Sequence, residues 1–559
     1  MDFQQLLDGA EVLFQRGNPA VLGLEYDSRR VQPGYVFVAM RGGTTDGNRY
    51  IEAALAGGAV AVVSDSPQAA PSSDIAWAQV AHGRRALARL SANFYKRPAE
   101  RLTLAGITGT NGKSTTAFLL ESVLKAARRK TALMGTIEYR IGNSVVSAPH
   151  TTPESLELNR FLGRALGEGV SEVVMEVSSH ALSQERVFGI PYDVAVFTNL
   201  TRDHLDYHKT LDDYFEAKKL LFAGVGTEPP RAAVVNLDDP RGEALAQFAK
   251  SQGSTVFTYG LKANDVYAEK VDVGLHGTRF DLVTPSGKVP LFSPMIGKVN
   301  VYNITAACAA AYARGIGSEA MSLGIEQLQR VPGRFERVDC GQPFTVVVDY
   351  AHTDDALRNL TTVAREFQRG RDGGCSCACH RKVKGSHQPE IGSSVVHSVP
   401  CCDRAYQPLA EVSSGRVITL FGCGGDRDRS KRPLMAKAAG EGSDFVILTS
   451  DNPRSEDPQA IIADALPGLK QTGVPYTVEL DRRKAIALAV EAAQPGDIVL
   501  LAGKGHEKVQ ITRNGVVPFD DIQVAAEALQ AAGYGKQEGS VDSAIRSAPK
   551  SGAPPGAHK

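Results

Sequence analysis

The sequence predicts an α/β protein of three domains, built on mostly parallel sheets. Three observations lead to this fold class: the chain has 559 residues, hydrophobic residues make up 43% of it, and short apolar runs alternate with helical patterns. Domains of about 100 to 200 residues would divide such a chain into three, each large enough to bury a core. Alternating strands and helices favour a parallel sheet covered on both faces, with ligands at the carboxyl ends of its strands.

The first domain is expected over residues 1–98. Two apolar segments, 35–40 and 59–64, have the pattern of strands, and a helical stretch at 50–56 lies between them. This order predicts a small N-terminal α/β domain. The linker to the next domain is expected near Lys96-Arg97-Pro98.

The central domain is expected over residues 99–332, where strands and helices alternate most regularly. This pattern predicts a mostly parallel sheet with helices on both faces. Its strands are expected at 102–108, 131–135, 172–178 and 193–199, and its helices at 113–127, 153–166 and 214–222.

A glycine-rich segment joins the first central strand to its helix, and it predicts a P-loop-type domain. Glycines let successive backbone N–H groups converge on an anion, and the helix start adds a partial positive charge. Lys113 can neutralise phosphate and Ser114 can offer a hydroxyl to Mg²⁺, so the loop predicts binding of ATP and Mg²⁺. Ile107 replaces the first glycine of the strict pattern, which makes this a variant loop. The predicted loop contacts are Gly109, Thr110, Asn111, Gly112, Lys113, Ser114 and Thr115.

Two further polar clusters follow apolar strands of the central domain. Glu176 ends one strand, and His204 lies just beyond the next. In a parallel sheet both would lie on the edge that carries the phosphate loop, so they could join Ser114 around Mg²⁺. A helix cap or a turn is the alternative for either cluster alone. Lys218, on the helix at 214–222, is by chemistry alone expected on a solvated face.

The third domain is expected over residues 333–535, as a second, Rossmann-like α/β sheet. Strands are expected at 345–349, 417–422, 445–449 and 497–502, with a helix at 482–492. Polar clusters follow all four strands, and turn chemistry alone does not require so many Arg, Lys and His residues. This rim is expected to bind an anionic or zwitterionic substrate. The clusters are Asp349-Tyr-Ala-His352, the segment 422–433, Asp451-Asn-Pro-Arg454 and Gly503-Lys-Gly-His-Glu507.

Two segments lie outside this pattern: an insertion at about 371–415 and the tail at 536–559. Neither has periodic apolar residues, so both are expected to be loop or disordered. The insertion has enough thiols and imidazoles for zinc, but single-residue spacings between its cysteines do not match ordinary zinc modules. A flexible insertion is the favoured interpretation. The residues concerned are Cys375, Cys377, Cys379, His380, His387, His397, Cys401 and Cys402.

Composition excludes several classes of function. Lys plus Arg and Asp plus Glu are equal at 62 each. The chain therefore has no overall positive charge whose electrostatic field would attract nucleic acid or an anionic membrane. The N-terminus lacks the order of a signal peptide, and no apolar run approaches the roughly 18 residues of a membrane helix. We therefore expect a cytoplasmic protein. Its eight cysteines do not imply a disulfide framework.

These motifs resemble the ATP-dependent Mur ligases. The loop Thr-Gly-Thr-Asn-Gly-Lys-Ser is that of a superfamily that also includes folylpolyglutamate synthases. Asp451-Asn-Pro-Arg454, followed by Glu456-Asp-Pro458, is similar to the signature of family members that add diaminopimelate. The resemblance runs from Asp27 to Glu507 and omits the insertion and the tail. The alternatives are a lysine-adding homologue, a folate-polyglutamylating ligase and, from another class, a nucleotide-binding scaffold without ligase chemistry.

The resemblance implies sites for a UDP-N-acetylmuramoyl dipeptide on the first two domains. Tyr26, Ser28, Gly43, Thr44 and Thr45 match positions that hold the UDP moiety. The positions that match contacts of the muramoyl peptide are His150, Thr151, Thr152, Ser178, Gln184 and Arg186. His150 stands where the family often has Asn.

The resemblance also changes the expected role of Lys218, which matches a lysine that family members carry as an N6-carboxylate. Lys218 would then bind Mg²⁺ with Ser114, Glu176 and His204, and these residues with Lys113 would form the catalytic set. Further ATP contacts are implied at Asn303, Arg334, Asp349 and His352. The residues that resemble a diaminopimelate pocket are Arg427, Asp451, Asn452, Pro453, Arg454, Gly503 and Glu507.

The reaction implied by the resemblance is amide formation in peptidoglycan precursor synthesis. ATP would phosphorylate the D-glutamate γ-carboxylate, and the amine of meso-diaminopimelate would attack the acyl phosphate. The central and C-terminal domains are expected to close together around this reaction, in a monomer without nucleic-acid or membrane partners. The sequence departs from the family's usual motif at one turn. Asp354 follows Asp-Tyr-Ala-His-Thr, where the family usually has Pro.

Overall fold

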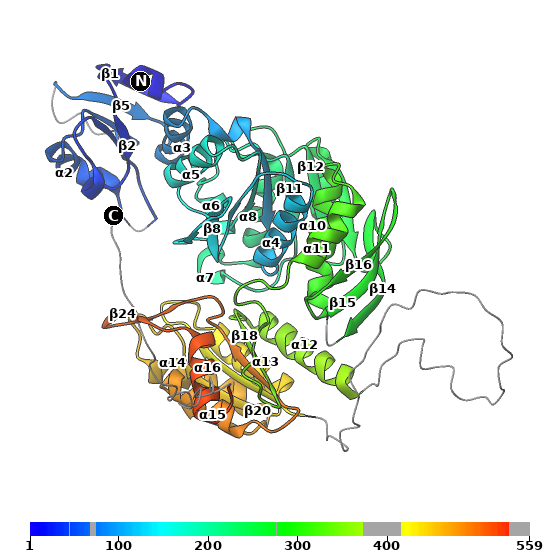
Figure 1. The fold of residues 1–559 in the computed structure, drawn as a ribbon. Coiled ribbons are helices and arrows are strands. Elements are labelled where there is room, and N and C mark those ends of the chain that lie inside the picture. Colours follow the sequence, from blue (N-terminus) through cyan, green and yellow to red (C-terminus); the bar gives the residue numbers. More distant parts are fainter. Residues whose placement is uncertain (44, 68–73, 275–276, 373–414, 536–559) are drawn as a thin grey trace, which may run out of the picture.

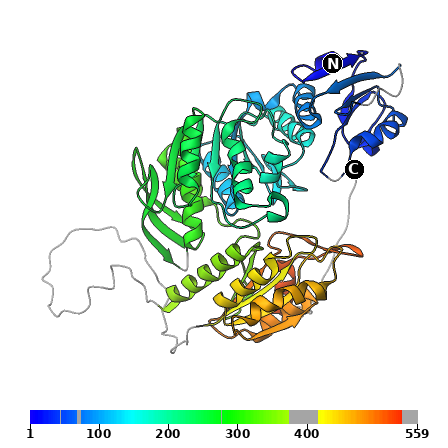
Figure 2. The ribbon, with the colours of Figure 1, turned by 180° about the vertical axis from the view of Figure 1, so that it is seen from behind.

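The computed structural model describes every residue except 44, 68–73, 275–276, 373–414 and 536–559. Three α/β sheets follow one another along the chain (Figure 1). The N-terminal sheet lies at one end, and the C-terminal sheet packs beneath the central one, an arrangement also seen from behind in Figure 2. Within the part of the chain that is described, no helix is long and apolar enough to cross a membrane.

The N-terminal sheet has five strands in the order β1-β5-β4-β3-β2. Trp77 and Phe37 fill the core on one face, and Leu87 and Leu90 fill the other. A tight turn at Lys96 and Arg97, both with positive φ, leads to Pro98 and the central sheet. The elements are α1 (Phe3–Leu6), β1 (Val12–Arg16), β2 (Gly23–Glu25), β3 (Tyr35–Ala39), α2 (Ile51–Ala56), β4 (Ala61–Ser64), β5 (Ala76–Val80) and α3 (Gly83–Phe94).

The central sheet has eleven strands, and its middle is parallel as the alternating pattern predicts. Apolar side chains of α4, α10 and α11 cover one face, and those of α5, α8 and α9 cover the other. The parallel strands are β6 (Thr103–Thr108), β7 (Thr131–Met134), β10 (Glu172–Glu176), β11 (Val194–Phe197), β12 (Ala232–Asn236), β13 (Thr255–Gly260) and β14 (Val266–Gly274). The helices are α4 (Lys113–Ala126), α5 (Ser155–Gly167), α6 (Ser179–Ser183), α7 (Leu205–His208), α8 (Leu211–Ala223), α9 (Gly242–Ser251), α10 (Lys298–Ala313) and α11 (Ser318–Gln327).

Antiparallel strands extend both edges of the central sheet, which the sequence pattern did not predict. They are β8 (Glu138–Ile141) and β9 (Ser144–Ser147) on one side, and β15 (Gly277–Thr284) and β16 (Gly287–Ser293) on the other. Antiparallel strands joined by tight turns need no crossover helix, so the alternation that revealed the other strands is missing here.

The C-terminal sheet has the order β17-β18-β22-β19-β20-β21 and is parallel except at β17. The four strands predicted to end in polar clusters are neighbours within it, so their carboxyl ends form one edge. The strands are β17 (Glu336–Val338), β18 (Thr345–Asp349), β19 (Val417–Cys423), β20 (Phe445–Ser450), β21 (Tyr476–Glu479) and β22 (Ile498–Ala502), with a separate hairpin of β23 (Val509–Thr512) and β24 (Gly515–Pro518). The helices are α12 (Asp354–Asp372), α13 (Lys431–Gly442), α14 (Pro458–Lys470), α15 (Arg482–Ala492) and α16 (Asp521–Ala531).

The first turn of α12 explains why Asp354 can stand where proline is usual. The Thr353 hydroxyl accepts a hydrogen bond from the N–H of Ala356 (3.1 Å), as a helix N-cap does. Asp354 is then the first helical residue, a position that suits proline because its N–H has no helical partner, and an acid because of the helix dipole. The helix ends at Asp372, close to the expected start of the insertion at about residue 371. The cysteines and histidines of the insertion, and the tail, lie outside the described residues.

Candidate active site

The phosphate loop lies between β6 and α4, and two of its glycines are required by close neighbours. Gly109 has φ 152°, and a Cβ there would lie 1.9 Å from the Thr198 hydroxyl oxygen. Gly112 has φ 85°, and a Cβ there would lie 2.4 Å from Oδ1 of Asn303. A side chain at either position would push aside a polar side chain of the site and would be strained by the positive φ, so both glycines favour the loop conformation.

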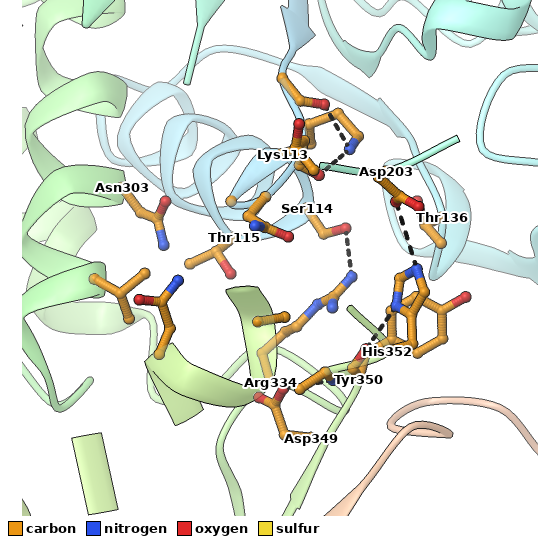
Figure 3. Close-up of a pocket in the computed structure, with 18 of the residues that line it drawn as sticks. Lys113, Ser114, Thr115, Thr136, Asp203, Asn303, Arg334, Asp349, Tyr350 and His352 are labelled. Atoms are coloured by element: carbon orange, nitrogen blue, oxygen red, sulfur yellow. Dashed lines mark hydrogen bonds and ion pairs between the residues drawn. The ribbon is translucent and has the colours of Figure 1, made fainter. Parts of the chain in front are cut away.

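The loop opens on a cavity of about 250 Å³ between the central and C-terminal sheets. Figure 3 shows Lys113, Ser114 and Thr115 on one side of it and Arg334, Asp349 and His352 on the other. Apolar side chains line a further part of the wall: Ile296, Val299, Leu360 and Val363. The cavity therefore combines a cationic loop for phosphates with apolar surface for a nucleotide base.

Lys113 bends back over its own loop. Its Nζ donates hydrogen bonds to the carbonyl oxygens of Gly109 (3.0 Å) and Thr110 (2.8 Å). Burial lowers the pKa of Lys113, and the nearby Glu176 and Asp203 carboxylates oppose that shift. An anion at the loop would supply the counter-charge that this ammonium lacks at short range.

Glu176 is held at the cavity by one residue that the sequence analysis did not single out. Its two carboxylate oxygens accept hydrogen bonds from the N–H (2.8 Å) and the hydroxyl (3.0 Å) of Thr136. The Thr136 hydroxyl also lies 3.0 Å from that of Thr151. Thr136 follows β7, so the same carboxyl edge of the sheet places it here, although its type gave no signal in the sequence.

Lys218 is buried, and the solvated face expected from its chemistry alone is wrong. Its side chain is about 1% exposed, and Nζ donates to the carbonyl oxygen of Gly109 (2.8 Å). The amine also lies 4.2 Å from the centre of the Tyr214 ring. Burial lowers the pKa of Lys218 well below its usual value, and the positive charge of Lys113 lowers it further. Both effects favour the neutral, nucleophilic form of the amine, which is the form that can take up a carboxylate group.

His204 faces the same cavity from a strained turn with φ 54°. Its ring lies 4.7 Å from that of His180, and its Nε2 lies 3.4 Å from the Asp203 carboxylate. Burial lowers the pKa of His204 to about 3 despite the opposing Asp203 charge, so the imidazole is neutral near pH 7. The unprotonated nitrogen of a neutral imidazole has a lone pair that is available to a metal ion.

The residues expected to hold Mg²⁺ surround one cavity, but they include one carboxylate and one imidazole only. Across the described ranges, no group of three or more His, Cys, Asp or Glu side chains is arranged to hold a metal ion. Mg²⁺ usually keeps several waters and binds one or two carboxylates plus substrate phosphates, so this sparse set fits it. Ser114, Glu176, His204 and Lys218 all line the cavity.

Side chains of the C-terminal domain reach across the cavity to the central domain. Arg334 donates to the Ser114 hydroxyl (3.1 Å), and Asp355 accepts from the Asn111 amide (2.8 Å). Lys431 donates to Asp203 (2.7 Å). From the sequence no role was assigned to Asp203, to Asp355 or to Lys431, which lies in the predicted segment 422–433. Each of these contacts joins two residues more than 200 positions apart, and the clustering of polar residues at strand ends does not by itself predict such contacts.

The remaining predicted ATP contacts lie on both walls. Asn303 projects from α10, and its amide donates to Oδ1 of Asn300 (3.2 Å). Asp349 accepts from the N–H groups of Phe335 (2.7 Å) and Ala351 (2.8 Å), which fixes the chain around the end of β18. His352 stands 3.9 Å from the Asp203 carboxylate.

The residues expected to bind diaminopimelate follow the neighbouring strands β19, β20 and β22 and do not line this cavity. The Asn452 amide donates to Glu507 (2.8 Å), and Arg454 donates to the carbonyl of Gly425 (2.7 Å). At Gly503, φ is 112° and a Cβ would lie 2.5 Å from the Asp451 carboxylate, so glycine is required. Burial raises the pKa of Asp451, and Arg482 and Lys504 oppose the shift.

Two other members of this predicted set differ in how they are held. Pro453 presents its carbonyl to Gly425, where a Cβ would lie 1.9 Å from that oxygen. Arg427 is exposed on the neighbouring loop and is near enough to Arg454 to lower the pKa of that guanidinium, whose main cause is burial. Two guanidinium groups on adjacent loops favour a carboxylate between them.

The residues expected to bind the UDP-linked peptide divide into two groups. Thr151 and Ser178 line the cavity. Arg186 lies outside it, donates to Gln184 (2.6 Å) and the Thr152 carbonyl (3.1 Å), and pairs with Glu154 (2.9 Å). The carbonyl of His150 accepts from the Tyr139 hydroxyl.

On the N-terminal domain, the Tyr26 hydroxyl donates to Glu157 of the central domain (3.3 Å). Ser28 begins a short 3₁₀ turn capped by Asp27, and Gly43 and Thr45 lie on the loop after β3. Thr44 lies outside the described residues. Tyr26, Ser28, Gly43 and Thr45 do not line the cavity.

The fold and the cavity define a ligase that uses ATP, and the chain belongs to the Mur ligase family. Three family descriptions match it: Mur ligase family, catalytic domain, over residues 21–95; Mur ligase middle domain over residues 107–311; and Mur ligase, glutamate ligase domain, over residues 381–505.

Two relatives and one solved structure that are similar to the chain carry the same activity in their names. The chain is 49% identical over 515 residues to the UDP-N-acetylmuramoyl-L-alanyl-D-glutamate–2,6-diaminopimelate ligase of Solibacter usitatus, covering 92% of this chain and 94% of the relative. It is 44% identical to the enzyme of the same name from Geobacter metallireducens, covering 91% and 94%. A solved structure of that name is 32% identical, with a TM-score of 0.62, over 96% of this chain and 99% of the other.

Proposed function

We propose that the protein uses ATP to join meso-2,6-diaminopimelate to the D-glutamate of UDP-N-acetylmuramoyl-L-Ala-D-Glu, in peptidoglycan precursor synthesis. The observation that carries the proposal is a single cavity where the phosphate loop, Glu176 and Lys218 face Arg334 of the other domain. Relatives 49% and 44% identical bear the name of this activity. The predicted diaminopimelate residues also lie together at one edge of the C-terminal sheet.

Activation of the glutamate would take place at the phosphate loop. The γ-carboxylate attacks the γ-phosphorus of ATP, the bond to the β–γ bridging oxygen breaks, and ADP leaves with the electron pair. Lys113, the N–H groups at the start of α4 and Arg334 would offset charge on the phosphates. Catalysis of this kind depends mainly on positioning, which explains why residues of two domains line the cavity.

Amide formation would follow when an amine of diaminopimelate attacks the acyl phosphate carbon. The carbon–oxygen bond to phosphate breaks, inorganic phosphate leaves, and the nitrogen gives up a proton. Arg454 and Arg427 are suited to a carboxylate of the amino acid, and Glu507 to its ammonium. These groups would hold the zwitterionic end that does not react.

We further propose that Ser114, Glu176, His204 and a carboxylated Lys218 hold Mg²⁺. Mg²⁺ bound there would neutralise charge on the transferring phosphoryl group. The burial of Lys218, which lowers the pKa of its amine, supports the modification, because an ammonium would be unfavourable beside Lys113. Lys218→Met should then abolish Mg²⁺-dependent ATP turnover while leaving the melting temperature unchanged or raised. Turnover equal to that of the unsubstituted protein would contradict the proposal.

One assay separates the proposed reaction from its alternatives. ADP release is measured with UDP-N-acetylmuramoyl-L-Ala-D-Glu and either meso-diaminopimelate or L-lysine as the amine. A separate assay replaces both substrates with a folate and glutamate. The proposal requires ATP turnover that depends on the UDP-linked dipeptide and is faster with diaminopimelate than with L-lysine. Preference for L-lysine would identify the lysine-adding homologue, and ATP binding without turnover would identify a nucleotide-binding scaffold. The monomeric state and the cytoplasmic location remain predictions of the sequence.

A further inference from the structure

A buried lysine lies directly beneath the predicted amine pocket, and the reaction described above gives it no role. Lys504 is 0% exposed, although lysine is among the residues least often buried completely. It lies on the loop after β22, between Gly503 and Gly505, both with positive φ. The sharp turn at each glycine directs the chain so that this side chain enters the protein.

The ammonium of Lys504 contacts two residues of the predicted diaminopimelate set. Its Nζ lies 3.0 Å from Oε2 of Glu507 and 3.2 Å from Oδ1 of Asn452. The Asn452 amide nitrogen donates to the same Glu507 oxygen (2.8 Å). The three side chains therefore form a closed triangle of hydrogen bonds.

This triangle fixes the orientation of the Asn452 amide. Oδ1 accepts from Lys504 and also from the N–H of Ile511 in the β23–β24 hairpin (2.9 Å). Two donors on one atom identify it as the carbonyl oxygen and leave the NH₂ group for Glu507. If the Lys504 ammonium were absent, rotating the Asn452 amide by 180° would break fewer hydrogen bonds.

The same triangle leaves one oxygen of Glu507 available. Oε2 takes both hydrogen bonds, whereas Oε1 makes none among the residues that the structure describes. The Glu507 side chain is 28% exposed, so Oε1 can meet a ligand. A carboxylate held on one oxygen presents the other in a fixed direction.

We propose that Lys504 is a positioning residue for the amine substrate, which acts through Asn452 and Glu507 to aim a carboxylate at the ammonium of an amino acid. This inference rests on the proposed function of the same pocket. Lys504 has no exposed surface, so it does not itself contact the substrate. It selects amino acids with a second charged end by fixing the group that recognises that end.

The first test replaces Lys504 with methionine, which has similar length and no charge. Loss of hydrogen bonds to charged groups should raise the KM for meso-diaminopimelate about 10- to 100-fold, with the KM for ATP and for the UDP-linked dipeptide changed less than about twofold. Initial rates of ADP release give all three constants. Equal increases in all three, or an unchanged KM for diaminopimelate, would overturn the proposal.

A double-mutant cycle distinguishes positioning from a purely structural role. If Lys504 acts through the carboxylate, then Lys504→Met should raise the KM for diaminopimelate much less in a Glu507→Gln background than in the unsubstituted protein. Full additivity of the two substitutions would contradict the inference. If Lys504→Met does not fold, Lys504→Gln, which keeps one donor, takes its place in the same cycle with the same expected result.

Arg416→Met is the matched control. Arg416 pairs with the buried Asp497 (2.7 Å) at the opposite, amino end of the same sheet. Its loss should lower the melting temperature without changing the KM for diaminopimelate. Wild-type protein that releases no ADP with diaminopimelate would refute the proposed function itself, whereas active wild type with an unaffected Lys504→Met would refute only the positioning role.

Discussion

The nucleotide cavity and the predicted amine pocket are built from similar charged residues but differ in how those residues are satisfied. The cavity has about 250 Å³ of space, and two of its walls come from different domains. In the amine pocket, Asn452, Lys504 and Glu507 bond to one another within a single domain. The nucleotide cavity is an open space between two domains, and the amine pocket is a pre-ordered network of hydrogen bonds.

This difference indicates how the two steps of the reaction are divided. Phosphoryl transfer requires cations from both domains around one substrate, and relative movement of the domains can assemble them. Recognition of a zwitterion requires fixed directions, and a buried network supplies them without any movement. We therefore expect substitutions in the cavity to affect turnover and substitutions in the network to affect the KM for one substrate.

The largest effect is expected for Lys113→Ala. Loss of the only lysine that the phosphate loop provides should lower ADP release about 10²- to 10³-fold, since charge developing on the phosphates is no longer offset. Steady-state ADP release with dipeptide and diaminopimelate measures it. Lys125→Ala is the control, because that residue lies on the same helix and pairs with Glu121 (2.8 Å) away from the cavity. Full ADP release by Lys113→Ala would show that the loop does not activate the substrate.

Much of the cavity could be predicted from the sequence because parallel strands end at a common edge. The strand-end rule brought Ser114, Glu176 and His204 together, and the structure places all three around one cavity. Chemistry alone assigned Lys218 to solvent, because the pattern of one helix does not reveal what packs against its polar positions. Resemblance to a family corrected that assignment, and the burial of the side chain agrees.

Some contacts around the cavity, within the central domain and between the domains, could not be predicted in the same way. Thr136 carries no charge and resembles any residue of a turn, yet it holds both oxygens of Glu176. The pairing of Lys431 with Asp203 depends on how two sheets pack, and periodicity within each sheet contains no information about that. The antiparallel edge strands were missed for a related reason, since their short hairpins lack the helix that marks a parallel crossover.

An intermediate effect is expected for Arg454→Lys, which keeps the charge but removes the planar fork. The KM for diaminopimelate should rise about tenfold because a bidentate contact with carboxylate is lost, while the KM for ATP stays unchanged. Arg513→Lys serves as the control, because Arg513 donates to the Ser455 carbonyl (2.8 Å) from an exposed position nearby. A parallel rise in the KM for ATP would show that the two sites are less separate than their contacts indicate.

The smallest effect is expected for Asp355→Asn, at a contact between the central and C-terminal domains beside the nucleotide cavity. Asp355 accepts from the Asn111 amide of the phosphate loop, and the neutral variant would keep an acceptor but lose the charge-assisted part of that bond. A loss of about 1 kcal/mol corresponds to about a fivefold lower kcat/KM for ATP, with the KM for diaminopimelate unaffected. Asp354→Asn is the matched control, because Asp354 pairs with Arg358 of its own helix (3.0 Å). If both variants lowered kcat/KM for ATP equally, the effect would come from the start of α12, and the contact between the domains would have no separate part in nucleotide binding.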